Sequence, residues 1–168
     1  ELQPPDGGRG ATVASLAEWL LAIPDIDGLT LSGGEPMDQA AALAELIEQV
    51  ARQRDLTTWC YTGYTLEQLV AEGNDAQLRL LALLDVLVDG PYLEERHTDL
   101  IWRGSDNQRI LSLTPRGRAL VPNVAERGSP IEVVIEDDGF FVMGIPPRGF
   151  RADFERVLAA RGISADPT

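Results

Sequence analysis

The segment that most constrains the fold of this chain is residues 29–36, Leu-Thr-Leu-Ser-Gly-Gly-Glu-Pro. Its first part is apolar with one β-branched residue, which is typical of a short buried strand. Residues 38–54 behind it carry apolar side chains at intervals of three and four positions, which predicts an amphipathic helix. A strand that enters a helix through two glycines places the connecting loop at the carboxyl end of the strand, where α/β proteins bind ligands. The sequence therefore predicts a ligand-binding loop in which Gly33 and Gly34 expose bare backbone and Glu35 adds a negative charge.

The next part of the chain alternates between strand and helix patterns. Predicted strands cover residues 56–61 and 86–88, and predicted helices cover residues 12–23, 66–72 and 76–84. Thr65 and Gln68 have the spacing of a capping box at the start of the second of these helices. Alternation of this kind predicts an α/β fold, with a parallel sheet and helices packed outside it. The length is that of one domain, so residues 1–168 are predicted to form a single domain.

After residue 92 the alternation weakens. Residues 94–106 are polar and mixed, and residues 114–130, with three prolines and three arginines, are predicted to be a loop or linker. A strand is predicted over residues 109–113, a hairpin over residues 131–135 and 140–142, and a final helix over residues 152–160.

The charge and composition exclude several classes of function. The formal net charge of −13 argues against a nucleic-acid partner, because phosphate binding needs clustered arginine and lysine. No run approaches the ~18 apolar residues of a membrane span, so no membrane partner is expected. All 14 basic residues are arginine, which excludes lysine Schiff-base chemistry. One cysteine and one histidine cannot form a disulfide or a multi-histidine metal site, and the lone thiol is typical of a cytoplasmic protein.

Three further motifs follow the Gly-Gly-Glu-Pro loop. They are Trp-Cys-Tyr-Thr-Gly-Tyr-Thr at residues 59–65, Val-Asp-Gly-Pro-Tyr at residues 88–92 and Trp-Arg-Gly-Ser-Asp-Asn-Gln-Arg at residues 102–109. In order and spacing, the four motifs resemble those of the activating proteins of anaerobic ribonucleotide reductase, a family of radical S-adenosylmethionine (SAM) enzymes. The resemblance covers about residues 28–110. Four motifs in order are far more specific than one glycine-rich turn.

The resemblance implies a fold, a cofactor and a partner. The fold would be a partial (β/α) barrel of the radical SAM type, followed by the predicted C-terminal hairpin and helix. The family uses one electron from a reduced 4Fe–4S cluster to cleave SAM, and the resulting 5′-deoxyadenosyl radical abstracts a hydrogen atom from a glycine of a partner glycyl-radical enzyme. Flavodoxin or ferredoxin is the implied type of electron donor. No catalytic residue is assigned, and the residues that the resemblance assigns to SAM binding are Ser32, Gly33, Gly34, Glu35, Pro36, Tyr61, Thr62, Gly63 and Asp89.

The cysteine content departs from the family pattern. Radical SAM enzymes ligate the cluster with three closely spaced cysteines ahead of the Gly-Gly-Glu-Pro strand, but no cysteine precedes residue 29 here. Cys60 is the only one, and its apolar strand predicts a small buried hydrophobe. We therefore expect that the cluster-binding strand and loop are missing from residues 1–168 and that these residues do not ligate the cluster. A natural relative without a cluster is the alternative.

Other interpretations of the motifs are open at this point. The glycines could serve only a packed helix-entry turn, and Asp89 could belong to an ordinary Asp-Gly turn. Residues 103–109 are either a polar turn or, because they are flanked by arginine and lie outside the βα pattern, a segment that faces the partner. The same fold could act on a peptide or small molecule, or be a binding domain without catalysis. His97 is expected at the surface.

Overall fold

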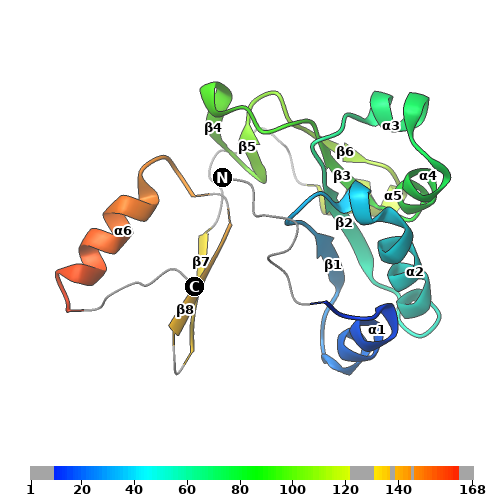
Figure 1. Ribbon diagram of the computed structural model, residues 1–168, viewed down its shortest axis with the longest axis horizontal. Helices are drawn as coiled ribbons and strands as arrows, with labels where there is room; N and C mark the ends of the chain where they lie inside the picture. The colour runs from blue at the N-terminus through cyan, green and yellow to red at the C-terminus, as the bar shows by residue number, and fades with distance from the viewer. Residues whose placement is uncertain (1–9, 122–130, 137–138, 145, 163–168) are drawn as a thin grey trace. The chain divides into compact units, whose positions relative to one another are not determined.

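The computed structural model describes residues 10–121, 131–136, 139–144 and 146–162 (Figure 1). The chain divides into two compact units. The sheet unit comprises Glu1–Tyr92 and Asn107–Asn123, and the hairpin unit comprises Leu93–Asp106 and Val124–Thr168. All residues predicted to bind SAM belong to the sheet unit. The assignment of one domain to residues 1–168 stays a prediction.

A four-stranded sheet forms the centre of the sheet unit, in the order β1-β2-β3-β6. The strands β1 (Gly28–Leu31), β2 (Thr57–Tyr61) and β3 (Val86–Asp89) are parallel, and β6 (Arg109–Ser112) pairs antiparallel to β3. The four predicted strands and the α/β class are therefore confirmed. The antiparallel direction of the last strand departs from the predicted parallel sheet, because no crossover α-helix lies between β3 and β6. These strands do not establish a (β/α) barrel of the radical SAM type, which stays a prediction.

Side-chain hydrogen bonds cap the first turn of most helices of this unit. The helices are α1 (Val13–Ala22), the 3₁₀ turn η1 (Pro36–Gln39), α2 (Ala40–Ala51), α3 (Leu66–Glu72), α4 (Asp75–Ala82) and α5 (Pro115–Leu120). The predicted capping box of Thr65 and Gln68 is confirmed at the start of α3. The predicted helix over residues 38–54 is split into η1 and α2, because Glu35 accepts the N–H of Met37 and thereby caps a separate 3₁₀ turn. No helix in the part of the chain that the structure describes is long and apolar enough to cross a membrane.

The loop predicted over residues 114–130 is wrong for Pro115–Leu120, which form α5. Thr114 caps this helix by accepting the Gly117 N–H at 3.1 Å. Pro115 occupies the first helical position, where a missing N–H removes no hydrogen bond. The Thr-Pro pair is therefore a helix start and not a loop signal. Residues 122–130 lie outside the described residues.

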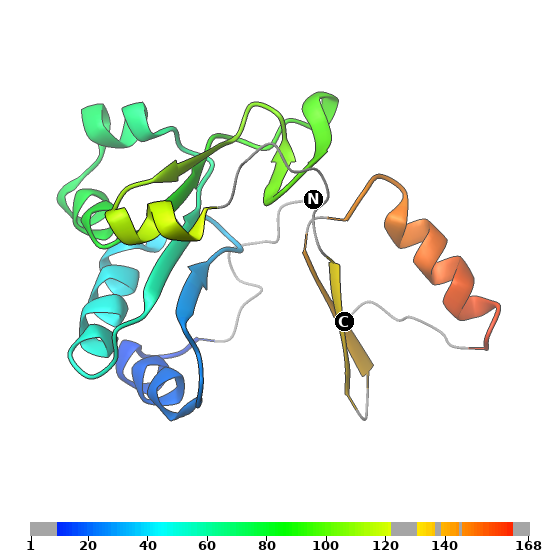
Figure 2. The same cartoon turned by 180° about the vertical axis from the view of Figure 1, so that it is seen from behind.

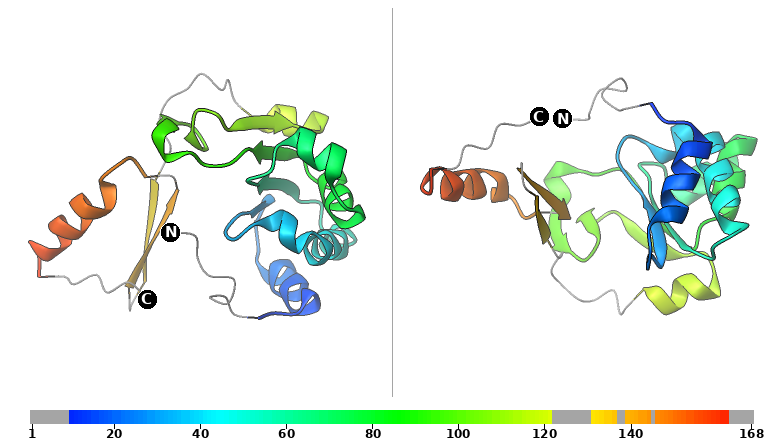
Figure 3. Two further views of the ribbon diagram at one scale, coloured as in Figure 1. Left: turned by 45° about the horizontal axis from the view of Figure 1, so that its top comes forward. Right: turned by 90° about the horizontal axis from the view of Figure 1, so that it is seen from below.

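One face of the sheet carries the main hydrophobic core. Leu31, Cys60 and Leu87 are neighbours across three strands and point to the same face. They pack in one cluster with side chains of α2 and α4, among them Ala44 and Leu80. Figures 1 and 3 show these helices beside the sheet. Full burial of one leucine contributes roughly 1.5–3 kcal/mol relative to exposure. This face therefore holds the parallel strands together and fixes the edge of the sheet at which their carboxyl ends meet.

The hairpin unit contains η2 (Glu94–Arg96), β4 (His97–Leu100), β5 (Arg103–Ser105), β7 (Ile131–Glu136), β8 (Gly139–Gly144) and α6 (Phe150–Ala159). The predicted hairpin is confirmed as β7-β8 (Figure 2), and the predicted final helix is confirmed as α6. The β4-β5 ribbon was not predicted, because its turn has Trp102 at a φ of 56° and not the glycine that marks such turns. His97, expected at the surface, is partly buried at the start of β4.

Candidate functional site

The loop that follows β1 presents open backbone. Ser32, Gly33 and Gly34 are exposed, and the two glycines have φ angles of 77° and 58°. A Cβ atom on Gly33 would meet no other atom within 4 Å. The glycines are therefore required by the left-handed backbone and not by close packing. Pro36 is buried behind them, at the start of η1.

The carboxylate of Glu35 points back into the protein and joins two loops. Its Oε1 accepts hydrogen bonds from the Met37 N–H at 2.9 Å and the Thr62 hydroxyl at 2.7 Å, and its Oε2 accepts the Gly63 N–H at 2.8 Å. A carboxylate has about four acceptor positions, so three protein bonds leave room for about one more. Glu35 therefore acts first as the connection between the β1 and β2 loops, and only its remaining position is open to a ligand.

The residues at the end of β2 are held from two sides. The Thr62 N–H donates to the Val88 carbonyl oxygen at 2.9 Å, and its hydroxyl oxygen accepts the Tyr64 N–H at 3.1 Å. Tyr61 is partly buried in the strand, and this burial raises the pKa of its phenol. Thr62 thus ties the β2 loop to β3 as well as to Glu35.

Asp89 ends β3 with only 1% of its surface exposed. Its Oδ2 accepts the Leu66 N–H at the start of α3 at 2.8 Å, and its Oδ1 accepts Arg109 Nε–H at 2.9 Å. A second N–H of the same guanidinium also donates to Asp89. Gly90 follows at a φ of 97°, as an Asp-Gly turn requires. Asp89 therefore joins β3, β6 and α3, and little of its carboxylate is free for a ligand.

Arg109 binds two carboxylates at once. Besides Asp89, it donates to both oxygens of Glu67 at 2.9 and 2.6 Å. The two carboxylates raise the pKa of Arg109, and Arg109 lowers the pKa of Glu67 to about 2. From the sequence, Arg109 was expected in either a polar turn or a segment facing a partner, and its contacts with Asp89 and Glu67 were not predicted. Nothing local indicates the contact, because the pairing of Arg109 with Asp89 depends on the antiparallel register of β6 with β3.

The predicted SAM-binding residues therefore fall into two groups. Glu35, Thr62 and Gly63 are joined directly by hydrogen bonds. Asp89 lies one strand away and reaches them through α3 and the loop before it. The sequence missed a further contact across the same edge, in which the Tyr64 hydroxyl donates to Asp38 Oδ1 at 3.1 Å.

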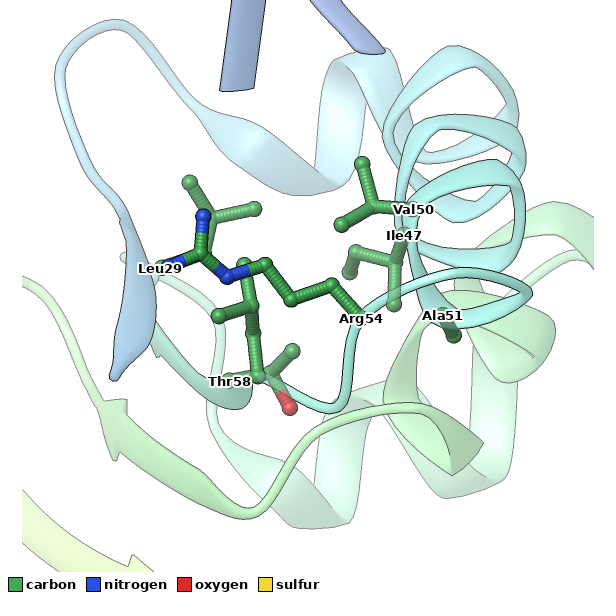
Figure 4. A pocket seen from close by; sticks show the side chains of 7 residues that line it. Leu29, Ile47, Val50, Ala51, Arg54 and Thr58 are labelled. Atoms are coloured by element: carbon green, nitrogen blue, oxygen red, sulfur yellow. The ribbon is translucent and has the colours of Figure 1, made fainter. Parts of the chain in front are cut away.

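A small cavity lies elsewhere, between α2 and the starts of β1 and β2 (Figure 4). Its volume is about 20 Å³, and it is lined by Leu29, Ile47, Val50, Ala51, Arg54, Leu56 and Thr58. Such a volume holds about one water molecule. The cavity is therefore too small to bind a cofactor, and the loops at the carboxyl ends of the strands remain the candidate site.

The residues present do not fit a 4Fe–4S cluster. Such a cluster needs several thiolate ligands, and the sequence contains one cysteine. Cys60 is fully buried in the core, as predicted, and burial together with the charge of Glu35 raises its pKa to about 12. Among the described residues, no three His, Cys, Asp or Glu side chains are grouped so that they could hold a metal ion. The glycine backbone after β1, by contrast, is exposed and open to a ligand.

Comparison with known proteins assigns the class. Residues 2–111 match the family described as 4Fe-4S single cluster domain, so the chain belongs to that family. It is 44% identical over 91 residues to the anaerobic ribonucleoside-triphosphate reductase-activating protein of Vibrio cholerae, covering 52% of this chain and 56% of that protein. The proteins of the same name from Pasteurella multocida (38% over 91 residues; 52% and 56%) and Haemophilus influenzae (39% over 87 residues; 49% and 54%) are similar too. The resemblance to this family of activating proteins is confirmed.

The match is partial in length. The chain spans about half the length of the curated relatives that it matches. No solved structure matches the chain.

Proposed function

We propose that this chain is the SAM-binding part of an activating enzyme that generates a glycyl radical on an anaerobic ribonucleotide reductase. The observation that carries the proposal is the family match over residues 2–111, together with relatives that are named as activators of that reductase. The open Gly33-Gly34 backbone at the carboxyl end of β1 supports it, because this is where α/β folds bind ligands. Flavodoxin or ferredoxin would supply the electron.

Each loop residue has a defined part in this function. Gly33 and Gly34 let the amino acid end of SAM approach the backbone, and the free acceptor position of Glu35 receives its ammonium group. Thr62 and Gly63 hold the Glu35 carboxylate in place from the neighbouring loop. SAM supplies the radical chemistry when it is bound and reduced, and the chain orients it and keeps water away. The cluster has no ligand set in these residues, so no step is assigned to it here.

The experiment uses the full-length gene product under anaerobic conditions, with a reductant, SAM and an anaerobic ribonucleotide reductase. Electron paramagnetic resonance should detect a glycyl radical on the reductase. The reductase without the activating protein is the control. SAM cleavage without a glycyl radical would contradict the proposed partner and favour a peptide or small-molecule substrate. Failure to bind or cleave SAM would favour a binding domain without catalysis.

A further inference from the structure

Three consecutive side chains before and in β6 hold the turn after β3. Asn107 Nδ2 donates to the Pro91 carbonyl oxygen at 2.7 Å, and Gln108 Nε2 donates to the Gly90 carbonyl oxygen at 3.1 Å. Arg109 binds the carboxylate of Asp89 through two N–H groups. Residues 107, 108 and 109 thus contact residues 91, 90 and 89 in order, as antiparallel chains do. We call residues 107–109 the bracket.

The turn at residues 89–91, which the bracket holds, is also hydrogen-bonded to the loop after β2. The Gly90 N–H donates to the Tyr64 carbonyl oxygen at 2.9 Å, and Asp89 accepts the Leu66 N–H at 2.8 Å. Tyr64 continues the contact inward, since its own N–H donates to the Thr62 hydroxyl oxygen. Thr62 then donates to Glu35. An unbroken series of hydrogen bonds therefore connects the bracket to the Gly-Gly-Glu-Pro loop.

The charge balance makes Arg109 the critical member. Asp89 is almost completely buried, and a buried carboxylate needs a compensating charge as well as hydrogen bonds. Arg109 is the cation that contacts it, and Glu67 fixes the other side of the same guanidinium. Without Arg109, Asp89 would draw in water or turn away, and the Leu66 N–H would lose its acceptor.

We infer that Asn107, Gln108 and Arg109 are positioning residues for the SAM loop and not contacts for the partner. They act through residues 89–91 and then residues 62–66, and Arg109 contributes most. The inference rests on the proposed function, because it concerns the same loop. It gives the bracket a role that its polar, arginine-flanked sequence alone does not reveal.

A matched control lies at the other end of β3, where Arg116 of α5 contacts Asp85, the residue just before the strand. Arg116 pairs with the buried Asp85 at 3.1 Å and with the exposed Asp55 at 2.6 Å, as Arg109 pairs with Asp89 and Glu67. Arg109 and Arg116 each expose 43% of their side chains. Arg109→Gln and Arg116→Gln therefore remove similar networks, and only the first network leads to the SAM loop.

The test compares full-length, cluster-loaded wild type, Arg109→Gln, Arg109→Lys and Arg116→Gln. Calorimetry gives SAM affinity, amide hydrogen exchange reports the Leu66 and Gly90 N–H groups, and urea unfolding gives stability. We expect Arg109→Gln to lower SAM affinity at least about tenfold and to speed exchange at Leu66 and Gly90, because small displacements of binding groups cost this much. Arg109→Lys should recover part of the affinity, since it keeps a charge beside Asp89. Arg116→Gln should lower stability and leave SAM affinity within about twofold of wild type.

The outcomes separate this inference from the proposed function. If wild type binds SAM and forms the glycyl radical but Arg109→Gln and Arg116→Gln have equal SAM affinity, the bracket is not a positioning device and the function stands. If Arg109→Gln binds and cleaves SAM normally but forms less glycyl radical, the segment faces the partner and the inference is overturned. If wild type does not bind SAM, both the function and the inference fail.

Discussion

The two ends of strand β3 carry the same arrangement of charges with different surroundings. At the carboxyl end, buried Asp89 accepts a backbone N–H and binds Arg109. At the amino end, buried Asp85 accepts the Thr58 N–H at 3.0 Å and binds Arg116 at 3.1 Å. In both cases a second, exposed carboxylate holds the far side of the arginine.

The difference lies in what surrounds each carboxylate. At the amino end, Asp85 also accepts the hydroxyls of Thr58 and Thr114, and a Cβ atom on Gly117 would lie 2.1 Å from the Asp85 carbonyl oxygen. At the carboxyl edge, the β1 loop, two strands from Asp89, has a glycine, Gly33, with no other atom within 4 Å of its Cβ position. A buried carboxylate is therefore a structural device at both ends. Only the carboxyl edge of the sheet also has open glycine backbone, in the β1 loop.

The largest effect on stability should come from the amino end of β3, where Asp85 is closely surrounded. We call this the closed end. Asp85→Ala removes the acceptor of several buried donors and leaves Arg116 without its buried partner. We expect a loss of about 3 kcal/mol in the free energy of unfolding, measured by urea denaturation, because each buried donor left without an acceptor costs about 1–3 kcal/mol. Asp55→Ala removes only the exposed partner and should cost less than about 1 kcal/mol. Equal losses in the two variants would contradict the special role of Asp85.

Packing at the closed end gives the next effect. In Gly117→Ala, the added methyl group would contact backbone atoms of Asp85 that cannot move without shifting the strand. Overpacking of this kind should cost about 1–3 kcal/mol. Gly10→Ala is the control, because nothing lies within 4 Å of its Cβ position. The melting temperatures of both variants should be measured by thermal unfolding. Equal melting temperatures would show that the contact between Gly117 and the Asp85 backbone is not tightly packed.

The stability that Asp85 contributes should also depend on pH. Burial alone would raise the pKa of Asp85, but hydrogen bonds from Thr114, Thr58 and Arg116 bring that pKa below its usual value. A carboxyl whose pKa is lower in the folded than in the unfolded protein stabilises the fold above its unfolded-state pKa. This stabilisation is lost as the pH falls through the folded-state pKa. We therefore expect the unfolding free energy of Asp85→Asn to change less between pH 5 and pH 3, about the range in which aspartate titrates, than that of wild type. Parallel curves would contradict the pKa assignment.

The smallest effect concerns the middle of the sheet, between the two ends. The Cys60 thiol is fully buried and its pKa is raised to about 12, so little thiolate forms at pH 8. A disulfide reagent should not modify this thiol in the folded protein. After unfolding in urea, the same reagent should modify the thiol completely. Rapid modification without denaturant would mean that the core face opens readily.

Local patterns predicted most of the sheet unit. Short apolar runs predicted β1, β2 and β3, and the spacing of Thr65 and Gln68 predicted the capping box of α3. Contacts between residues distant in sequence were not predictable. Arg109 is twenty positions from Asp89, and only the antiparallel pairing of β6 brings them together. The β4-β5 ribbon was missed for a local reason, because Trp102 stands where a glycine would have marked the turn.

The same limits apply to the candidate site. The Gly-Gly-Glu-Pro loop could be placed at the carboxyl end of a strand from its sequence. The orientation of the Glu35 side chain could not be predicted, because its hydrogen-bond partners Thr62 and Gly63 lie in the next loop. Its charge was expected to face a ligand, and in the structure most of its hydrogen-bonding capacity serves the protein.

The central claim is that the open backbone at Gly34 binds SAM, and one titration tests it most directly. Gly34→Val adds bulk there. The control Gly149→Val makes the same change just before α6, at another glycine of positive φ (79° against 58°) with no atom within 4 Å of its Cβ position. Both variants bear similar backbone strain. Calorimetry on cluster-loaded, full-length protein should show at least about tenfold weaker SAM binding for Gly34→Val and near wild-type affinity for Gly149→Val. Equal SAM affinities in the two variants would contradict the claim.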